Sequence, residues 1–83
     1  MLYVLTVIFE DSESKIFDSA TEKFKDRDKA FKKFNSLIDV CKEIEGITVE
    51  KEIREENGGL YICINEAGER LEIGMNKLEL YDF

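Results

Sequence analysis

The chain has 83 residues and a formal net charge of −7, and it contains neither histidine nor proline. A chain of this length has room for one hydrophobic core, so we expect a single domain over residues 1–83. Without histidine the usual general base near neutral pH is missing, and the net negative charge opposes direct contact with nucleic acid or an anionic membrane.

The first predicted element is a strand over Leu2–Phe9, which is apolar at both odd and even positions. Such a strand is normally central in a sheet and covered on both faces. After a polar turn over Glu10–Lys15, the stretch Ile16–Lys25 fits two structures: an edge strand that pairs with the first strand, or the start of a long helix with a capping box at Ser19–Glu22. We favour the strand, because a helix that continued to residue 45 would be long for so small a domain.

A helix over residues 26–45 is the clearest element. Asp26 is a good N-cap residue, and Gly46 follows as the C-terminal stop. Apolar residues recur at three- and four-residue spacing and form one stripe along the helix. The stripe consists of Ala30, Phe31, Phe34, Leu37, Ile38, Cys41 and Ile44.

Three strands are predicted after the helix. In the first of them Ile47, Val49 and Ile53 share one face, and Asn57-Gly58 follows as a type I′ hairpin turn, since both residues tolerate positive φ. The next strand is expected to point its leucine and isoleucines at the helix and its tyrosine and cysteine away from it. The strand residues predicted to pack under the helix are Val49, Leu60, Ile62, Ile64, Leu71 and Ile73.

The last strand begins after a turn at Gly68. Its apolar residues change parity between Met75 and the pair Leu78 and Leu80, so we predict a bulge or kink at Gly74–Lys77. The complete order is β-β-α-β-β-β. It predicts a two-layer α+β fold, in which one amphipathic helix packs on a mostly antiparallel sheet of four to five strands.

No group of residues predicts catalysis, a cofactor or a metal ion. Two cysteines without histidine cannot supply the four ligands of a zinc site, and the acidic turn after the first strand lacks the spacing of a calcium loop. Cys41 is expected to be buried and Cys63 to be partly exposed. Since the sequence shows neither a signal peptide nor an apolar run of about 20 residues, we expect a soluble, reduced, cytoplasmic protein that is not an enzyme.

Negative charge is concentrated in the last part of the chain. Residues 46–83 contain nine acidic and four basic side chains, whereas residues 26–45 contain five of each. Alternation places several glutamates on outer strand faces at a spacing of about 6.5–7 Å, and such a row can contact a basic protein groove that normally binds nucleic acid. The alternative is that these charges only prevent edge aggregation. The candidate protein-binding residues are Glu50, Glu52, Glu56, Tyr61 and Glu72.

The first strand raises a second possibility. One helix covers only one face of a sheet, so the side chains on the other face of Leu2–Phe9 need different cover. Tyr61, Tyr81 and Phe83 are candidates from the same chain. A partner chain is the alternative, and a homodimer is its simplest form, because apolar strips bordered by acids are typical of interfaces.

In length, acidic composition and layout, the whole chain resembles the small acidic accessory proteins of phages and mobile elements, which include anti-CRISPR inhibitors and nucleic-acid mimics. The resemblance implies a binding or inhibitory protein. We therefore expect a protein-binding module, best described as a phage-type inhibitor that docks an acidic sheet face on a basic groove of its target. The first alternative is a homodimeric structural or regulatory module that associates through the first strand. The second is a small-ligand binder with an apolar pocket between helix and sheet.

Overall fold

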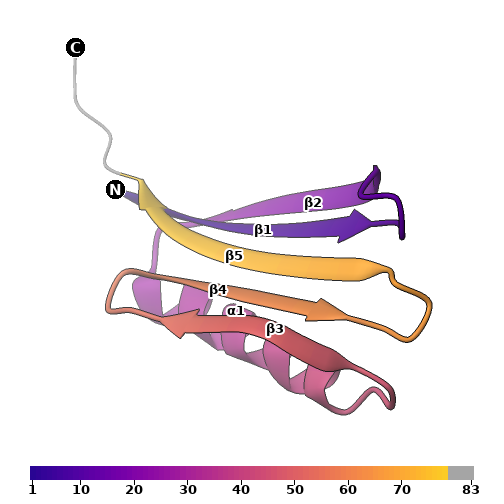
Figure 1. Ribbon diagram of the computed structural model, residues 1–83. Coiled ribbons are helices and arrows are strands. Elements are labelled where there is room, and N and C mark those ends of the chain that lie inside the picture. Colours follow the sequence, from indigo (N-terminus) through magenta and orange to yellow (C-terminus); the bar gives the residue numbers. More distant parts are fainter. Residues whose placement is uncertain (79–83) are drawn as a thin grey trace.

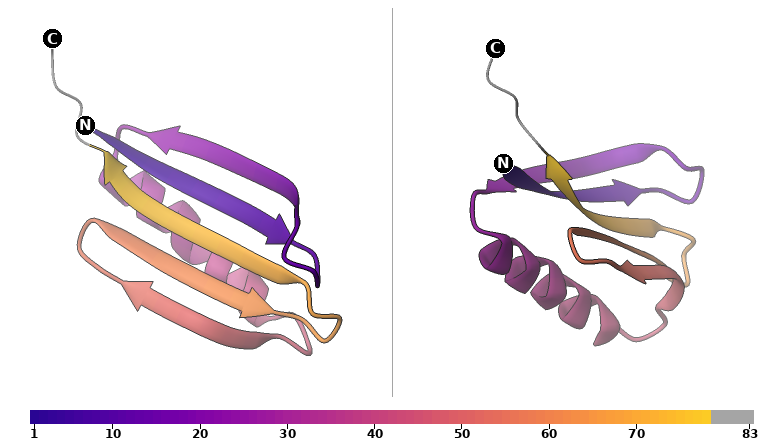
Figure 2. Two further views of the ribbon diagram at one scale, coloured as in Figure 1. Left: turned by 45° about the horizontal axis from the view of Figure 1, so that its top comes forward. Right: turned by 90° about the vertical axis from the view of Figure 1, so that its left-hand side faces the viewer.

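The computed structural model describes residues 1–78 (Figure 1). The elements are β1 (Leu2–Glu10), β2 (Ile16–Phe24), α1 (Arg27–Lys42), β3 (Thr48–Arg54), β4 (Gly58–Ile64) and β5 (Arg70–Leu78). The five strands form one antiparallel sheet in the order β2-β1-β5-β4-β3. The helix lies across one face of this sheet (Figures 1 and 2). The predicted α+β fold and its order of elements are confirmed.

The stretch that fitted either a strand or a helix is strand β2. It pairs with β1 from Phe24 opposite Tyr3 to Ile16 opposite Glu10. The helix begins after it, where the Asp26 carboxylate accepts a hydrogen bond of 2.8 Å from the backbone N–H of Asp28. The N-cap therefore separates strand from helix, as predicted, although α1 ends at Lys42 rather than at residue 45.

The core lies between α1 and one face of the sheet, which we call the helix-covered face. Residues directly opposite each other in an antiparallel pair share a face. Ile73 in the central strand β5 lies opposite Val7 in β1 and Tyr61 in β4, so these three side chains form a row under α1. The buried residues are Tyr3, Leu5, Ala30, Phe34, Ile38, Cys41, Tyr61, Cys63, Ile73 and Met75.

The prediction of which β4 side chains face α1 is wrong. Tyr61 and Cys63, expected to point away from α1, are 0% and 1% exposed beneath it. Leu60 and its alternate neighbours therefore point to the opposite face. The pairing with β5 explains the difference, since it sets Tyr61 beside Ile73, and β5 is the strand whose apolar residues alternate regularly. Gly59 lies on the same face of β4 as Tyr61 and Cys63, beneath α1. It leaves room for the helix, because a Cβ there would lie 2.8 Å from the ring of Phe34.

The predictions for β3 and its turn also need correction. A β-bulge between Val49 and Lys51 changes the parity, so that Val49 lies on the helix-covered face and Ile53 on the other. The Glu55 N–H donates to the carbonyl of Gly58 at 2.9 Å, which leaves residues 56 and 57 as the hairpin turn. Neither residue 57 nor Gly58 has positive φ, so the predicted type I′ turn is wrong. The strand register, with Gly59 beneath Phe34, determines where the turn falls.

Strand β5 has no bulge. It pairs without interruption with both β1 and β4, so the bulge predicted at Gly74–Lys77 is wrong. The change of apolar parity has a simpler cause: Leu78 points to the face away from α1, where it is 47% exposed. The predicted continuation at Leu80, and the proposed covering residues Tyr81 and Phe83, lie outside the described residues.

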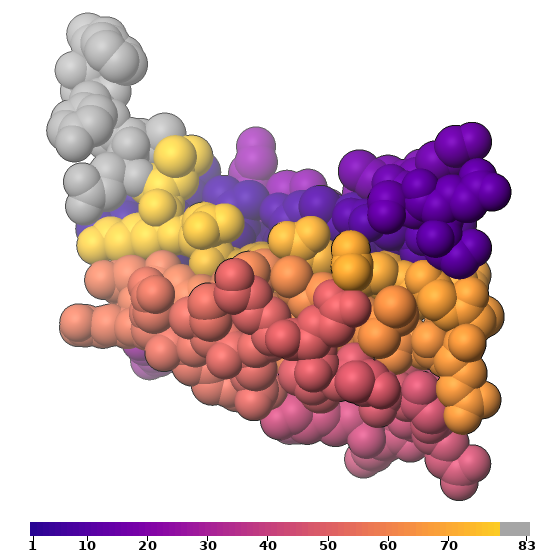
Figure 3. Space-filling view, viewed as in Figure 1, coloured from indigo at the N-terminus to yellow at the C-terminus, as the bar shows by residue number. Residues whose placement is uncertain are grey.

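The second face of the sheet, which we call the open face, points away from α1. In Figure 2 (left) the sheet lies between the viewer and the helix, and in Figure 3 the strands lie side by side on the visible surface. Among residues 1–78 no helix or strand covers this face. Its half-buried apolar side chains are Leu2, Val4, Ile8, Leu60, Ile62 and Ile64.

Candidate functional site: an acidic end with an apolar cleft

Three chain connections meet at one end of the sheet (Figure 1). They are residues 11–15 between β1 and β2, residues 43–47 between α1 and β3, and residues 65–69 between β4 and β5. The connections touch one another: a Cβ on Gly68 would lie 3.2 Å from the Cβ of Ser12, and a Cβ on Gly46 would lie 2.8 Å from Oε1 of Glu66. We call this the acidic end. Its three connections contain six carboxylates and one lysine: Asp11, Glu13, Glu43, Glu45, Glu66, Glu69 and Lys15.

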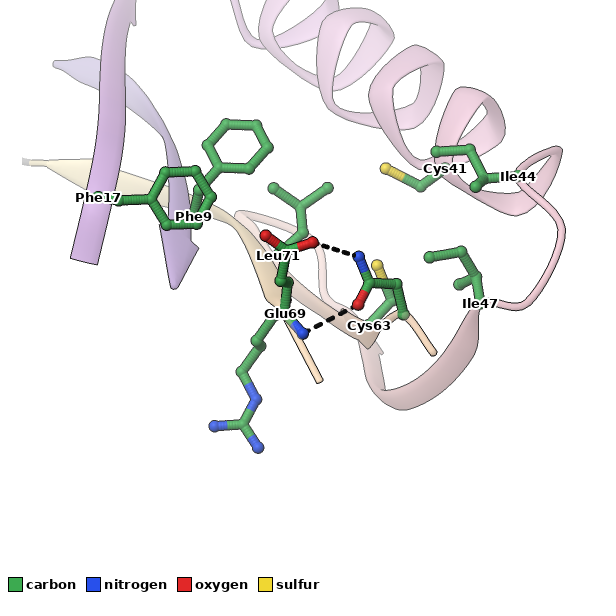
Figure 4. A pocket seen from close by; sticks show the side chains of 10 residues that line it. Phe9, Phe17, Cys41, Ile44, Ile47, Cys63, Glu69 and Leu71 are labelled. Carbon is green, nitrogen blue, oxygen red and sulfur yellow. Dashed lines mark hydrogen bonds between the residues drawn. The ribbon is translucent and has the colours of Figure 1, made fainter. Parts of the chain in front are cut away.

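Some of these carboxylates order the turns themselves. Asp11 accepts hydrogen bonds of 2.9 Å from the backbone N–H groups of Glu13 and Lys15. Asn65 and Glu69 exchange two hydrogen bonds of 2.9 Å, one of them through the Asn65 side-chain amide and the Glu69 carboxylate (Figure 4). These local contacts hold the two hairpin turns in one conformation.

The other carboxylates are directed at solvent. Glu13 lies 3.7 Å from the ammonium group of Lys15, in an exposed pair that contributes little to stability. Within the described part of the chain, no side-chain hydrogen bond or ion pair holds Glu43, Glu45 or Glu66. These three side chains are therefore available to a partner.

An apolar cleft of about 360 Å³ opens at the same end, between the C-terminal part of α1 and the sheet. Figure 4 shows Cys41 and Ile44 on the helix side and Phe9, Phe17 and Leu71 on the strands. The rings of Phe9 and Phe17 are 6.0 Å apart and tilted by 41°. Two large apolar side chains stand at its mouth, since Phe17 is 58% and Ile44 is 52% exposed. An apolar centre surrounded by charge is the usual anatomy of a protein interface.

Two thiols line the inner part of the cleft. Cys41 and Cys63 are both buried and unoxidised, so the prediction that Cys63 is partly exposed is wrong. Burial is the main cause that raises the pKa of Cys41 to about 11, and burial also raises the pKa of Cys63. At neutral pH both groups are thiols rather than thiolates, and a thiol is a poor nucleophile.

Tyr61 lies next to these thiols, beneath the helix. Burial is also the main cause that raises the pKa of its phenol to about 12. Among residues 1–78 the hydroxyl finds no hydrogen-bond partner in good geometry, although the Cys63 thiol is its neighbour. Tyr61 was expected among the protein-binding residues, but its side chain is fully buried, so no partner reaches it in this conformation.

The predicted row of glutamates does not form on one face. The bulge in β3 turns Glu52 to the helix-covered side, where its carboxylate lies 2.8 Å from the ammonium group of Lys42 and 3.6 Å from the guanidinium group of Arg54. The hydrogen bond from Lys42 is the main cause that lowers the pKa of Glu52. Glu50 is instead paired with Arg70 at 3.0 Å. The two residues therefore sit in separate ion pairs.

Of the remaining two members of the row, one lies in a turn and the other lies near Arg70, the ion-pair partner of Glu50. Glu56 lies in the β3–β4 turn at the far end of the sheet, where its carbonyl accepts a hydrogen bond of 2.9 Å from Nε of Arg27. Glu72 is on the open face, opposite Ile8 in β1 and Ile62 in β4. The row itself was a wrong prediction, while a protein-binding role for its individual residues stays a prediction.

The acidic end is not predictable from the sequence alone, because its residues come from three separate connections. Each connection does carry a local signal, namely acids next to a turn residue, as in Glu45-Gly46 and Glu66-Ala67-Gly68-Glu69. Only the strand order brings these signals together. The pattern becomes visible once the β1–β2 and β4–β5 turns are known to lie at the same end.

The fold and this site define a small acidic α+β protein with one helical layer, an apolar cleft at its acidic end and an open sheet face. Comparison with protein-family models, curated proteins and solved structures finds no match to the chain. Within residues 1–78 there is no group of three or more side chains suited to holding a metal ion. Over the same residues, no helix has the length and apolar character needed to cross a membrane.

Proposed function

We propose that this chain is a non-enzymatic protein-binding module that docks its acidic end on a basic surface of another protein. The observation that carries the proposal is the position of the apolar cleft, whose exposed Phe17 and Ile44 lie among the carboxylates of three turns. A large apolar side chain of the partner fits a cleft of about 360 Å³. Lysines and arginines around that side chain then face Glu43, Glu45 and Glu66.

The charge supports a basic partner for two reasons. The net charge of −7 attracts a basic surface over a distance of about 8 Å at physiological ionic strength, which speeds encounter. The carboxylates at the acidic end also lie beside the C-terminus of α1, where the helix dipole adds negative potential. Together the apolar centre gives affinity and the charged rim gives orientation.

The specific version of this proposal is an inhibitor of a nucleic-acid-binding protein. Carboxylates that stand where phosphates normally bind compete with nucleic acid for the same groove. This is the function implied by the resemblance to phage and mobile-element accessory proteins, and it places the module in the cytoplasm with its target.

The test uses a photo-crosslinking amino acid in cells of the source organism. At Ile44, in the mouth of the cleft, we expect one discrete adduct. At Lys29, exposed on α1 at the opposite end, we expect none. The adduct should disappear in a variant with Glu43→Lys, Glu45→Lys and Glu66→Lys, which should remain folded because exposed substitutions usually change stability by less than about 0.5 kcal/mol each.

The partner recovered in this way allows a direct measurement. Its binding to the purified protein should weaken as salt rises and should compete with nucleic acid. Equal adducts from Ile44 and Lys29, or binding that survives the triple reversal and high salt, would overturn the proposal.

A further inference from the structure

The three central strands of the open face differ in character. β1 and β4 present mainly apolar side chains, among them Ile8 and Leu60, whereas β5 between them presents Arg70, Glu72, Gly74 and Asn76. Arg70 pairs with Glu10 of β1 at the edge of the face. The face is therefore two apolar ridges separated by a polar strand. An apolar sheet face of this extent normally lies against another layer.

Gly74 marks the middle of this face. It lies opposite Thr6 in β1 and Leu60 in β4, and a Cβ added to it would meet no atom of residues 1–78 within 4 Å. A shallow hollow of about 390 Å³ opens above it, with Glu72 and Asn76 at its sides. Glycine inside a strand weakens the strand and often marks a bulge, a bend or a contact site, and β5 has neither a bulge nor a break in its pairing.

We propose that a second copy of this chain covers the open face, with the two sheets stacked face to face, their strands antiparallel and a two-fold axis crossing β5 at Gly74. The proposal does not depend on the function assigned to the acidic end, because the side chains proposed to contact a partner there do not lie on the open face.

The centre of the open face is complementary to itself in this arrangement, whereas at its margins the Glu10–Arg70 pair lies over the partner's Leu2 and Leu78. Each strand stacks on the same strand of the partner, and a residue two places before Gly74 lies over the residue two places after it. Glu72 of one copy therefore faces the partner's Asn76, whose amide can donate to the carboxylate, and this contact occurs twice. Ile8 faces the partner's Val4 in the same way. Stacked sheets are about 10 Å apart, a gap that a glutamate and an asparagine span together.

The charges select this orientation over the other face-to-face dimer. An axis parallel to the strands would place Glu72 against Glu72 and bring the two acidic ends together. The antiparallel stack instead puts the acidic ends at opposite poles. Each then lies nearest the opposite end of the other copy, where Lys23 and Lys25 are accompanied by acids such as Asp26 and Glu56, so the repulsion is weaker than between two acidic ends.

The size of the face is sufficient for a stable dimer. Five strands about 4.8 Å apart, of seven to nine residues at about 3.3 Å each, give a surface of roughly 24 by 23–30 Å, or about 550–700 Å². Stable protein interfaces bury about 600–1,000 Å² on each partner, so the face reaches the lower part of this range. The whole open face, rather than β1 alone, is therefore needed.

Gly74→Lys is the decisive variant. Because a side chain at this position meets open space, the variant should fold, yet it places two ammonium groups at the axis. In sedimentation equilibrium from about 10 µM to 1 mM, the wild-type mass should approach twice the 9.7 kDa of the chain. Gly74→Lys should weaken the dimer at least tenfold, whereas Ser36→Lys, the same charge change on the exposed side of α1, should leave it intact.

Two further measurements test the register and separate this proposal from the partner at the acidic end. Asn76→Asp sets a carboxylate against Glu72 and should weaken the dimer, while Asn76→Lys should strengthen it. Since both copies carry −7, raising the salt concentration should favour self-association, whereas it should weaken binding of a basic partner. A wild-type protein that is monomeric at 1 mM and high salt, or equal dimers of Gly74→Lys and Ser36→Lys, would overturn the second copy without affecting the acidic-end proposal.

Discussion

Both faces of the sheet carry rows of apolar residues, yet only one is sealed. Under α1 the side chains of Tyr61, Cys63 and Ile73 are almost fully buried, whereas on the open face Leu60 and its neighbours are half-buried. In β4 the more hydrophobic set of alternate side chains, which includes Leu60, is therefore the one that the helix does not cover. The comparison shows that hydrophobicity alone does not select the covered face. The regularly alternating strand β5 selects it, and its neighbours follow through their pairing.

The largest effect should separate the two faces directly. Phe34 packs between α1 and the sheet and is 1% exposed, so Phe34→Ala should lower the free energy of unfolding by about 3–5 kcal/mol. Leu60→Ala on the open face should lower it by less than about 1 kcal/mol in the monomer. Urea unfolding at low protein concentration, where no dimer forms, measures both. Equal losses would mean that the open face is as well packed as the helix-covered one.

The elements themselves were predictable because their signals are local. The 3.6-residue stripe and the Asp26 cap define α1, and the long-helix alternative fails because the cap interrupts it. Which side chains of β4 face α1 could not be predicted from β4 alone. Their direction depends on the register with β5, whose residues are about ten positions away in the sequence. The bulge at Glu50 likewise has no signature in the sequence, and it alone removes Glu52 from the predicted row.

The candidate site was less predictable than the fold. Its carboxylates could be counted, but their gathering at one end depends on the strand order. An apolar pocket between helix and sheet was anticipated as an alternative, yet its position followed only from where α1 ends. Ile44 belongs to the apolar stripe by spacing, but it lies beyond the last helical residue and is half exposed at the cleft.

The second prediction concerns a polar group on the sealed face. Within the described part of the chain the Tyr61 hydroxyl is buried without a hydrogen bond in good geometry, and burying such a group costs about 1–3 kcal/mol. Tyr61→Phe removes the hydroxyl and keeps the ring, so it should stabilise the protein by about 1 kcal/mol. Thermal unfolding reports the change, with Tyr3→Phe as the matched control. A destabilised Tyr61→Phe variant would show that the hydroxyl is satisfied by Cys63 after all.

A third prediction follows from the raised pKa values beneath the helix. The pKa of Cys41 is raised from 9.0 to about 11 and that of Tyr61 from 10.0 to about 12, so the folded protein holds these protons more tightly than the unfolded chain does. Their contribution is complete below about pH 9 and is lost as the pH rises through 11 to 12. The urea midpoint should therefore fall above pH 9, and less steeply in Cys41→Val. Equal slopes for the variant and the wild type would contradict the assignment.

The smallest effect tests where β3 directs its glutamates. The hydrogen bond from Lys42 lowers the pKa of Glu52 below its usual 4.5, so the pair stabilises the folded state above that pH and the contribution disappears as the pH falls through the lowered value. Glu52→Gln should therefore slightly lower the urea midpoint at pH 7, and the difference from the wild type should shrink as the pH falls below 4.5. Glu56→Gln, in the hairpin turn, should change it at none of these pH values. If the two variants behaved alike at pH 7, Glu52 would be free of Lys42, and a continuous acidic row on β3 would again be the better description.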